Sequence, residues 1–167
     1  MFDLPRYSGW DALHPVISHF PIALLLVAPF CLAAAIALRK HRTALAVTAL
    51  GLSLAGTFGV YLAAATGDAA RDAARAAAPQ SQELKAALAT HEDLGSVARA
   101  AFSVLTAALA ALLAAPPLLK RELPARRLVA GLALLLVLYL GAGLALVNTA
   151  HTGGLLVHRL GVHAPIR

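Results

Sequence analysis

Four long apolar stretches separated by short polar segments dominate the pattern of this chain. They cover about residues 16–38, 44–66, 97–119 and 128–150. Each is long enough for the roughly 20 residues that a helix needs to cross the hydrocarbon core of a bilayer. The runs are continuous rather than alternating, so they predict helices and not the strands of a membrane β-barrel. We therefore expect an all-α, integral membrane four-helix bundle that forms a single domain over residues 1–167.

The composition agrees with a membrane protein. Hydrophobic residues make up 60% of the chain and charged residues 13%, and the mean hydropathy is +0.76. Soluble domains have about 45–50% apolar and about 25% charged residues, and disordered chains are poor in apolar residues, so both classes are excluded. The net charge of +6 does not indicate nucleic acid, because the basic cluster lies in short loops between apolar runs.

The charges of the connecting segments predict an orientation. The short loops at residues 39–42 and 120–127 hold about half of all Lys and Arg, with Glu122 as their single acid. In the two tails and the long loop at residues 67–96, acidic and basic residues roughly cancel. The positive-inside rule places the short basic loops in the cytoplasm. We therefore expect a multi-pass protein of the bacterial inner membrane, with both termini and the long loop in the periplasm.

The long loop is expected to be largely helical. Opposite charges stand three apart over residues 68–75, as on a solvated helix face, so the second span is predicted to continue until Pro79 ends it. A short helix over residues 81–89 is expected next. Thr90 has the character of an N-cap for the third span, which would put His91 in the first turn of that helix.

Six of the seven histidines lie on the predicted periplasmic side, and His41 lies on the cytoplasmic side. Three of the four spans thereby bring an imidazole to one membrane depth, which predicts a cofactor or metal site. The preferred ligands are His19, His91 and His151, with His14 as a fourth candidate. The secondary candidates are His158 and Asp68, and His163 lies further along the C-terminal tail.

The expected positions of these histidines suit metal ligation. His14 precedes Pro15 and is expected at or near the N-cap of the first span, and His91 in the first turn of its helix. The positive end of a helix dipole disfavours an added charge, which keeps imidazole in the neutral form that binds metals. His151 is expected to point inward, because polar residues within spans usually face the bundle interior.

Small residues mark one face of the second span. Gly56, Gly59, Ala63 and Gly67 recur at spacings of three and four. Such a stripe lets a neighbouring helix or a flat ligand approach closely. The sequence leaves both interpretations open.

Three stretches resemble a known family. Residues 13–24 read Leu-His-Pro-Val-Ile-Ser-His-Phe-Pro-Ile-Ala-Leu, residues 66–68 read Thr-Gly-Asp, and residues 151–157 begin His-Thr-Gly-Gly. Over about residues 13–162 the chain is similar to the bacterial membrane family called domain of unknown function 2231. The resemblance implies a four-helix membrane domain, joined in some members to cytochrome c-like or Rieske-like electron carriers, and so implies electron transfer. The chain has no CxxCH motif, so any haem would be non-covalent, of b type.

Three functional hypotheses follow. The leading one is a membrane b-type cytochrome-like protein, with haem b held near the periplasmic face by two histidines and a periplasmic electron carrier or a quinol as partner. The second is a copper- or zinc-binding membrane protein, with acidic residues of the long loop (Asp68, Asp72, Glu92 or Asp93) as outer partners. The third is a cofactor-free membrane scaffold subunit whose histidines are merely hydrated or hydrogen-bonded. An electron carrier or subunit is favoured over a stand-alone enzyme, and a homo-oligomer stays open.

Overall fold

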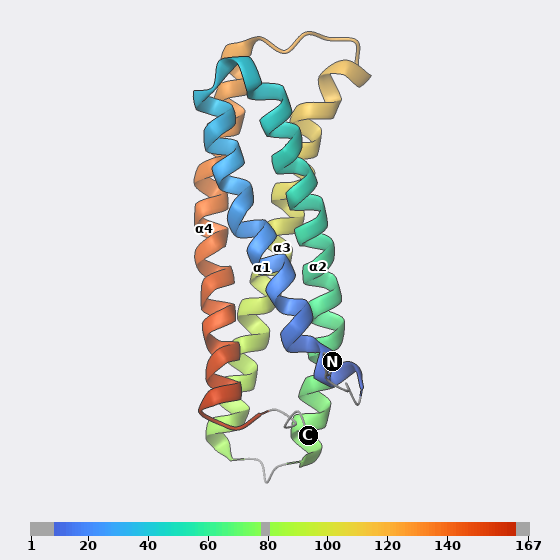
Figure 1. Ribbon diagram of the computed structural model, residues 1–167, viewed down its shortest axis with the longest axis vertical. Coiled ribbons are helices and arrows are strands. Elements are labelled where there is room, and N and C mark those ends of the chain that lie inside the picture. Colours follow the sequence, from blue (N-terminus) through green and yellow to red (C-terminus); the bar gives the residue numbers. More distant parts are fainter. Residues whose placement is uncertain (1–8, 78–80, 163–167) are drawn as a thin grey trace, which may run out of the picture.

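The computed structural model describes residues 9–77 and 81–162 of the chain. These residues form four long helices and one short 3₁₀ turn, without a strand among them (Figure 1). The elements are α1 (Trp10–Ala37), η1 (Arg39–His41), α2 (Arg42–Ala77), α3 (Gln82–Leu118) and α4 (Ala125–His158). The predicted all-α four-helix architecture is thereby confirmed.

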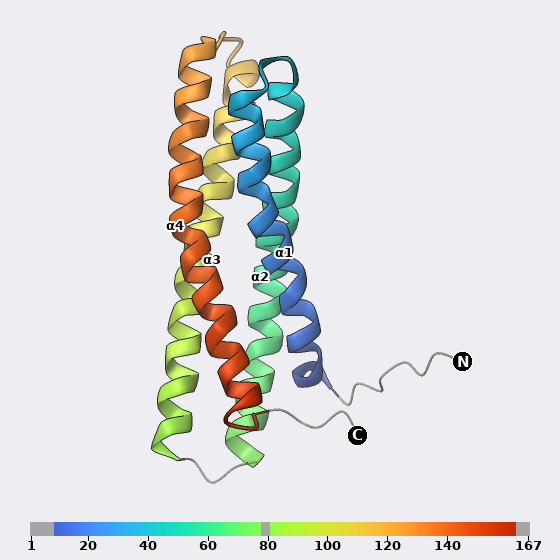
Figure 2. The same ribbon diagram turned by 60° about the vertical axis from the view of Figure 1, so that its left-hand side comes forward.

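The molecule consists of two helical hairpins, α1–α2 and α3–α4, that pack side by side (Figures 1 and 2). α1 also contacts α4, and α2 contacts α3, whereas α1 and α3 stand diagonally opposite, as do α2 and α4. The connections within both hairpins lie at one end of the bundle, here called the loop end. The start of α1 and the end of α4 lie toward the opposite end, here called the terminal end.

Local side-chain contacts define several helix ends. At the loop end, the Arg42 guanidinium donates to the carbonyl oxygens of Ala35 (3.1 Å) and Ile36 (3.4 Å), which satisfies acceptors in the last turn of α1. At the terminal end, the Ser81 hydroxyl accepts from the Leu84 amide at 3.1 Å and caps α3. These contacts account for the sharp turn within the first hairpin and the start of the third helix.

The third helix differs from the prediction. Residues 82–89 are helical, as predicted, but Gln82–Leu118 is one continuous helix, so the separation of this segment from the third span and the N-cap at Thr90 are wrong. The Thr90 hydroxyl instead donates to a carbonyl of the preceding turn at 2.9 Å. Ser81 supplies the cap, and the polar residues after it continue as a solvated helical face rather than interrupting the helix. The predicted end of α2 at Pro79 lies outside the described residues.

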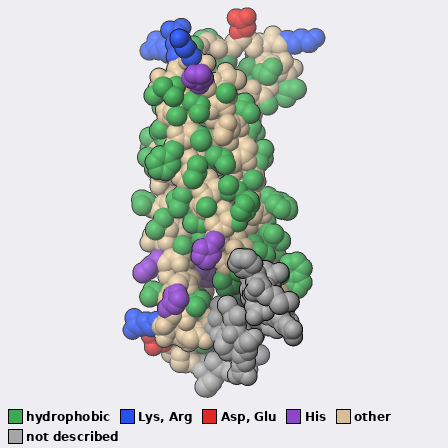
Figure 3. Space-filling model, in the orientation of Figure 1, with side chains coloured by type: hydrophobic (Ala, Val, Ile, Leu, Met, Phe, Trp, Pro, Cys, Tyr) green, Lys and Arg blue, Asp and Glu red, His purple; other side chains and the backbone are tan. Residues whose placement is uncertain are grey.

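The bundle is apolar both inside and on most of its outer surface. Its core contains Leu25, Leu32, Phe102, Leu109 and Leu132, each at most 1% exposed. Large apolar side chains also point outward, among them Phe30 (74% exposed) and Phe58 (72%), and hydrophobic side chains are spread along the length of the bundle in Figure 3. All four helices are long and apolar enough to cross a membrane, and the apolar surface is consistent with contact to lipid.

The two hairpins share one packing plan. When the sequence of α1 is aligned with that of α3 so that His14 matches His91, buried positions of α1 match buried positions of α3. The matched pairs are Pro21 with Ala98, Leu25 with Phe102, Ala28 with Leu105, and Leu32 with Leu109. When Thr66 is aligned with Thr152, α2 matches α4 in the same way, with Ala46, Ala49, Ser53 and Gly56 on Leu132, Leu135, Tyr139 and Ala142. The chain is therefore built as two equivalent halves, although the aligned residues differ.

A cluster of hydroxyl groups lies within the apolar core and joins three helices. The Tyr139 hydroxyl on α4 donates to Ser53 Oγ on α2, and Ser53 Oγ donates to a carbonyl of its own helix at 2.7 Å. Thr57 and Thr106 bring α2 and α3 together through a hydroxyl pair at 2.8 Å. No buried side-chain N or O atom among the described residues lacks a hydrogen-bond partner, so this polar cluster is internally satisfied.

Candidate functional site

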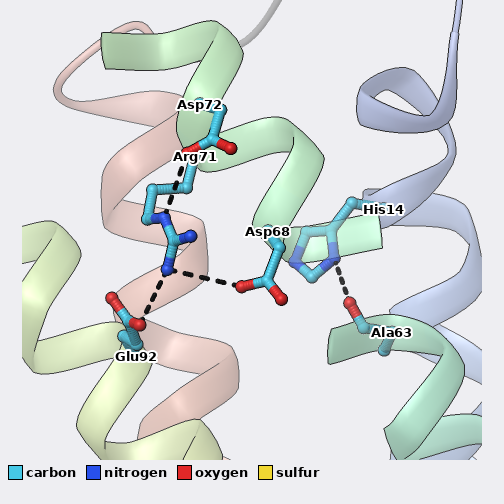
Figure 4. Close-up of polar contacts among 6 residues, drawn as sticks. All are labelled: His14, Ala63, Asp68, Arg71, Asp72 and Glu92. Atoms are coloured by element: carbon cyan, nitrogen blue, oxygen red, sulfur yellow. Dashed lines mark hydrogen bonds and ion pairs between the residues drawn. The ribbon is translucent and has the colours of Figure 1, made fainter. Parts of the chain in front are cut away.

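His14 reaches from α1 onto the backbone of α2. Its Nδ1 lies 2.9 Å from the Ala63 carbonyl oxygen and 3.2 Å from Thr66 Oγ1, and Figure 4 shows the ring directed at that carbonyl. Ala63 and Thr66 lie one turn apart and are both buried. This turn of α2 therefore fixes the orientation of the half-buried imidazole.

His91 makes the same arrangement in the second hairpin. Its Nδ1, on α3, lies 3.0 Å from the Thr149 carbonyl oxygen and 3.1 Å from Thr152 Oγ1 on α4. The acceptors are again a carbonyl and a threonine hydroxyl three residues later. The repeated packing plan thus extends to the polar contacts of the two histidines.

The hydrogen bonds determine which ring nitrogen carries the proton. A carbonyl oxygen can only accept, so Nδ1 must be the donor in both histidines. Each threonine hydroxyl donates to the same carbonyl, at 3.0 Å for Thr66 to Ala63 and 2.9 Å for Thr152 to Thr149, and so can accept from the imidazole. A neutral ring with its proton on Nδ1 has its lone pair on Nε2, the tautomer commonly found in metal-ligating histidines.

The two imidazoles meet across the bundle. The ring centroids of His14 and His91 are 6.2 Å apart, and the ring planes are inclined at 87°. The two residues come from the diagonally opposite helices α1 and α3, while the neighbouring helices α2 and α4 hold their Nδ1 atoms. Four helices therefore contribute to one site, and its two halves are equivalent.

A glycine lies beside each ring. A Cβ atom built on Gly67 would lie 3.0 Å from Cε1 of His14, and one built on Gly153 would lie 3.0 Å from Cε1 of His91. Either contact is too tight for ordinary carbon packing. The other two glycines of the predicted stripe on α2 face α1, Gly56 toward Leu25 and Gly59 toward Pro21. The stripe therefore serves close helix packing and also makes room for an imidazole.

An ion-pair cluster begins at Asp68, the residue after Gly67 on α2 (Figure 4). The Arg71 guanidinium on α2 contacts Asp68 at 3.3 Å and Asp72 at 3.4 Å on its own helix, and Glu92 on α3 at 2.7 Å. This cluster joins α2 to α3 beside His91. It also commits three of the acidic residues considered as metal partners to an arginine.

The other candidate histidines lie outside the pair. His19 is exposed, and its Nδ1 donates to the Pro15 carbonyl of its own helix. His151 is also exposed, so the expectation that it points inward is wrong. The reason is helical phase: α4 turns Thr152 toward His91, and the adjacent residue is rotated by about 100° around the helix. His158 is exposed as well, and His163 lies outside the described residues.

The positions of His14 and His91 along their helices also differ from the prediction. α1 begins at Trp10 and α3 at Gln82, so neither histidine occupies an N-cap or first turn. The argument from the helix dipole is therefore wrong for both. Hydrogen bonding to the neighbouring helix orients these rings instead.

The sequence interpretation noted the Thr-Gly pairs at residues 66–67 and 152–153 but did not assign them to the two rings. Thr66 and Thr152 supply the hydroxyls, and Gly67 and Gly153 supply the space. A signal was present, because α2 and α4 each contain a Thr-Gly pair and each follows a helix with a histidine. This signal can be interpreted only once the packed helices show that the α1–α2 and α3–α4 hairpins are equivalent.

The donor set limits what the site can bind. Within residues 9–77 and 81–162, no group of three or more His, Cys, Asp or Glu side chains is arranged to hold a metal ion. A structural zinc site takes four ligands and a catalytic one at least three, so the described residues do not fit zinc. Two imidazoles could hold a group that takes two protein ligands, such as a haem or a copper ion.

Comparisons with family models, with curated proteins and with solved structures find no match to this chain. The resemblance to domain of unknown function 2231 therefore remains a prediction.

Proposed function

We propose that the chain is a membrane-embedded electron-transfer protein that holds haem b between His14 and His91. The observation that carries this proposal is the matched pair of imidazoles from α1 and α3, each with Nδ1 bound to the next helix. Four-helix bundles commonly build cofactor sites from residues on facing helices. The proposal replaces the preferred ligand set of His19, His91 and His151 with a pair that the fold brings together.

The spacing of the rings is compatible with a metal held between them. With a metal–imidazole bond of about 2.0–2.1 Å on each side, two imidazoles placed opposite each other on one ion have centroids roughly 6 Å apart. The His14 and His91 centroids are 6.2 Å apart. Direct edge-to-face contact of two rings has a similar separation, so the experiment below tests for the bound group itself.

Each part of the site has a separate task under this proposal. His14 and His91 would hold the haem, Thr66 and Thr152 orient the rings and hold the proton on Nδ1, and the glycines admit the rings close to α2 and α4. When bound between these two imidazoles, a haem would supply reversible one-electron transfer. A periplasmic electron carrier or a membrane quinol is the proposed partner.

The proposed membrane placement follows from the two ends of the bundle. In Figure 3 most of the visible Lys and Arg side chains lie at the loop end, which also carries His41, and the other visible histidines lie toward the terminal end of the same face. The positive-inside rule then puts the loop end in the cytoplasm and the histidine pair near the periplasmic face of a bacterial inner membrane. Single cysteines introduced by Lys40→Cys and Ser81→Cys in a Cys31→Ala background test this with an impermeant maleimide. Spheroplasts should label the Ser81→Cys variant and not the Lys40→Cys variant, and the reverse pattern would contradict the orientation.

An absorbance spectrum tests the cofactor. Detergent-purified protein from haem-replete cells should show a sharp Soret band and should gain α and β bands when dithionite is added. His14→Ala and His91→Ala should each lose most of this spectrum. His19→Ala and His151→Ala are matched controls, because both histidines are exposed outside the pair, and they should retain it. A wild-type spectrum without these bands, or bands that persist in both ligand variants, would refute the haem proposal.

Copper is the second candidate, favoured by the donor set of two imidazoles without a third ligand among the described residues. Elemental analysis of the same preparations distinguishes it. About one copper per chain that is lost in His14→Ala and His91→Ala, with no stoichiometric iron, would replace haem by copper. If neither metal is present and a partner protein co-purifies, the scaffold hypothesis is supported instead.

A further inference from the structure

Arg99 is an unusual residue for its position in the chain. It is the one Asp, Glu, Lys or Arg within the four predicted spans at residues 16–38, 44–66, 97–119 and 128–150. Charged side chains are rare in membrane segments and occur mainly near their ends, where they reach the interface. Neither the histidine pair nor the Arg71 cluster uses this side chain.

The side chain of Arg99 rests on an aromatic platform. Its Cζ lies 6.0 Å from the centroid of the Tyr61 ring, which comes from the adjacent helix α2. Ser103 Oγ donates to the Arg99 carbonyl at 2.7 Å and lies 3.0 Å from the Tyr61 hydroxyl, which is therefore the donor in that contact. The serine thus anchors the tyrosine, and the tyrosine supports the guanidinium by cation–π contact.

The charge of Arg99 is not balanced within the described part of the chain. The ion pairs found there involve Arg71 and Arg159, and none includes Arg99. Arg99 is half-buried, whereas Tyr61 is 52% exposed. A planar guanidinium fixed in this way presents N–H donors that match the oxygens of a phosphate group.

The depth of this cluster corresponds to a layer of lipid headgroups. Arg99 precedes the end of α3 at Leu118 by about 28 Å of helix, at 1.5 Å per residue. Tyr61 follows the start of α2 at Arg42 by about the same length. A hydrocarbon core is about 30 Å thick. With the loop end at one membrane surface, both residues therefore reach the opposite surface, where lipid phosphates lie.

We propose that Arg99, Tyr61 and Ser103 form a binding site on the α2–α3 seam for the phosphate group of an anionic lipid in the periplasmic leaflet. Charge complementarity selects this ligand, because the cation lacks a carboxylate partner among the described residues. The inference rests on the membrane placement proposed above and is independent of the cofactor.

Lipid binding to the purified full chain tests the site. Delipidated protein in detergent is titrated with phosphatidylglycerol or phosphatidylcholine, and native mass spectrometry counts the bound lipids. Wild-type protein should bind one phosphatidylglycerol through Arg99, in preference to phosphatidylcholine. Arg99→Gln should weaken phosphatidylglycerol binding about tenfold or more. This loss of affinity is the one expected when a charge-assisted hydrogen bond is removed. Arg126→Gln is the matched control, because it removes an exposed arginine at the loop end, and it should leave the Arg99-dependent lipid in place.

Further variants separate the site from a general charge effect. Tyr61→Leu should weaken phosphatidylglycerol binding, and the double variant Arg99→Gln/Tyr61→Leu should be no weaker than Arg99→Gln alone, because the platform acts through the guanidinium. Inorganic phosphate at millimolar concentration should not displace the lipid if the source is a headgroup. Full displacement would assign the site to free phosphate and overturn the lipid proposal.

Two failures can be told apart. If carbonate washing extracts the wild-type protein from membranes, the membrane placement fails and this site fails with it. If the protein stays in the membrane but Arg99→Gln binds phosphatidylglycerol as tightly as wild type, this site alone is wrong.

Discussion

Gly153 on α4 lies against the imidazole of His91 so closely that a Cβ at this position would be 3.0 Å from Cε1 of the ring. The next residue, Gly154, has nothing within 4 Å of the same built atom. Two adjacent glycines of one helix thus face very different surroundings. The contrast supplies an internal control for the importance of space beside the histidine.

Gly153→Ala should displace His91, because the ring or the helix must move by a few tenths of an ångström. We expect a loss of about 1–3 kcal/mol in stability, as for overpacked cores, and a several-fold fall in bound cofactor. Gly67→Ala should displace His14 in the same way and cause similar losses of stability and bound cofactor. Gly154→Ala should be neutral or stabilising by up to about 1 kcal/mol, since alanine favours helix. Unfolding in mixed micelles and the absorbance spectrum measure both effects, and equal behaviour of the two adjacent variants would contradict the packing argument.

Thr66→Val and Thr152→Val remove the hydroxyls that accept from Nδ1 while keeping the side-chain shape. The hydrogen bonds from His14 and His91 to the backbone carbonyls remain, so the rings should stay in place but be fixed less firmly. Loss of such an outer partner typically lowers metal affinity roughly 10–100-fold, and the weaker acceptor should raise the midpoint potential of a bound haem. Redox titration and cofactor retention test this prediction. Thr48→Val is the control, because Thr48 is exposed and donates to its own helix at 3.0 Å.

Tyr139→Phe should destabilise the bundle without affecting the histidine site. The Tyr139 hydroxyl is buried and donates to Ser53 on another helix. Side-chain hydrogen bonds between membrane helices contribute on average about 0.6 kcal/mol and at most about 1.7 kcal/mol. A double-mutant cycle with Ser53→Ala isolates the pair. A coupling energy near zero would show that this contact does not hold α2 and α4 together.

Ion pairing at the terminal end should contribute modestly and should depend on salt. The Arg71–Glu92 contact at 2.7 Å joins α2 to α3 and involves a half-buried arginine, with 24% of its side chain exposed. We expect a coupling of about 0.2–1 kcal/mol that falls as ionic strength rises. The Arg159–Glu83 pair, at 3.7 Å and largely exposed on both sides, should show no measurable coupling. Double-mutant cycles at low and high salt compare the coupling energies of the two ion pairs. A stronger coupling for Arg159–Glu83 than for Arg71–Glu92 would contradict this prediction.

Much of the fold could be predicted because it depends on local properties of the chain. Hydrophobic runs of membrane-spanning length predict helices directly, and charged or proline-containing segments mark their connections. Small residues at spacings of three and four predicted a face on α2 that a helix or a flat ligand could approach closely, and α1 packs there against Gly56 and Gly59. The continuity of residues 82–89 with the third span was missed because Thr90 has the residue type of an N-cap, whereas a helix already capped at Ser81 passes through it.

The sequence by itself determined four apolar helices, their order, and the gathering of histidines at one end. Only the tertiary structure decided which histidines meet. His14 and His91 lie on diagonal helices, and their contact depends on the rotation of each helix about its axis, which is set by packing against its neighbours. His151 faces outward for the same reason, because α4 directs Thr149 and Thr152 toward His91. The sequence determines where a residue lies along its helix, but the packing of all four helices determines which neighbour its side chain faces.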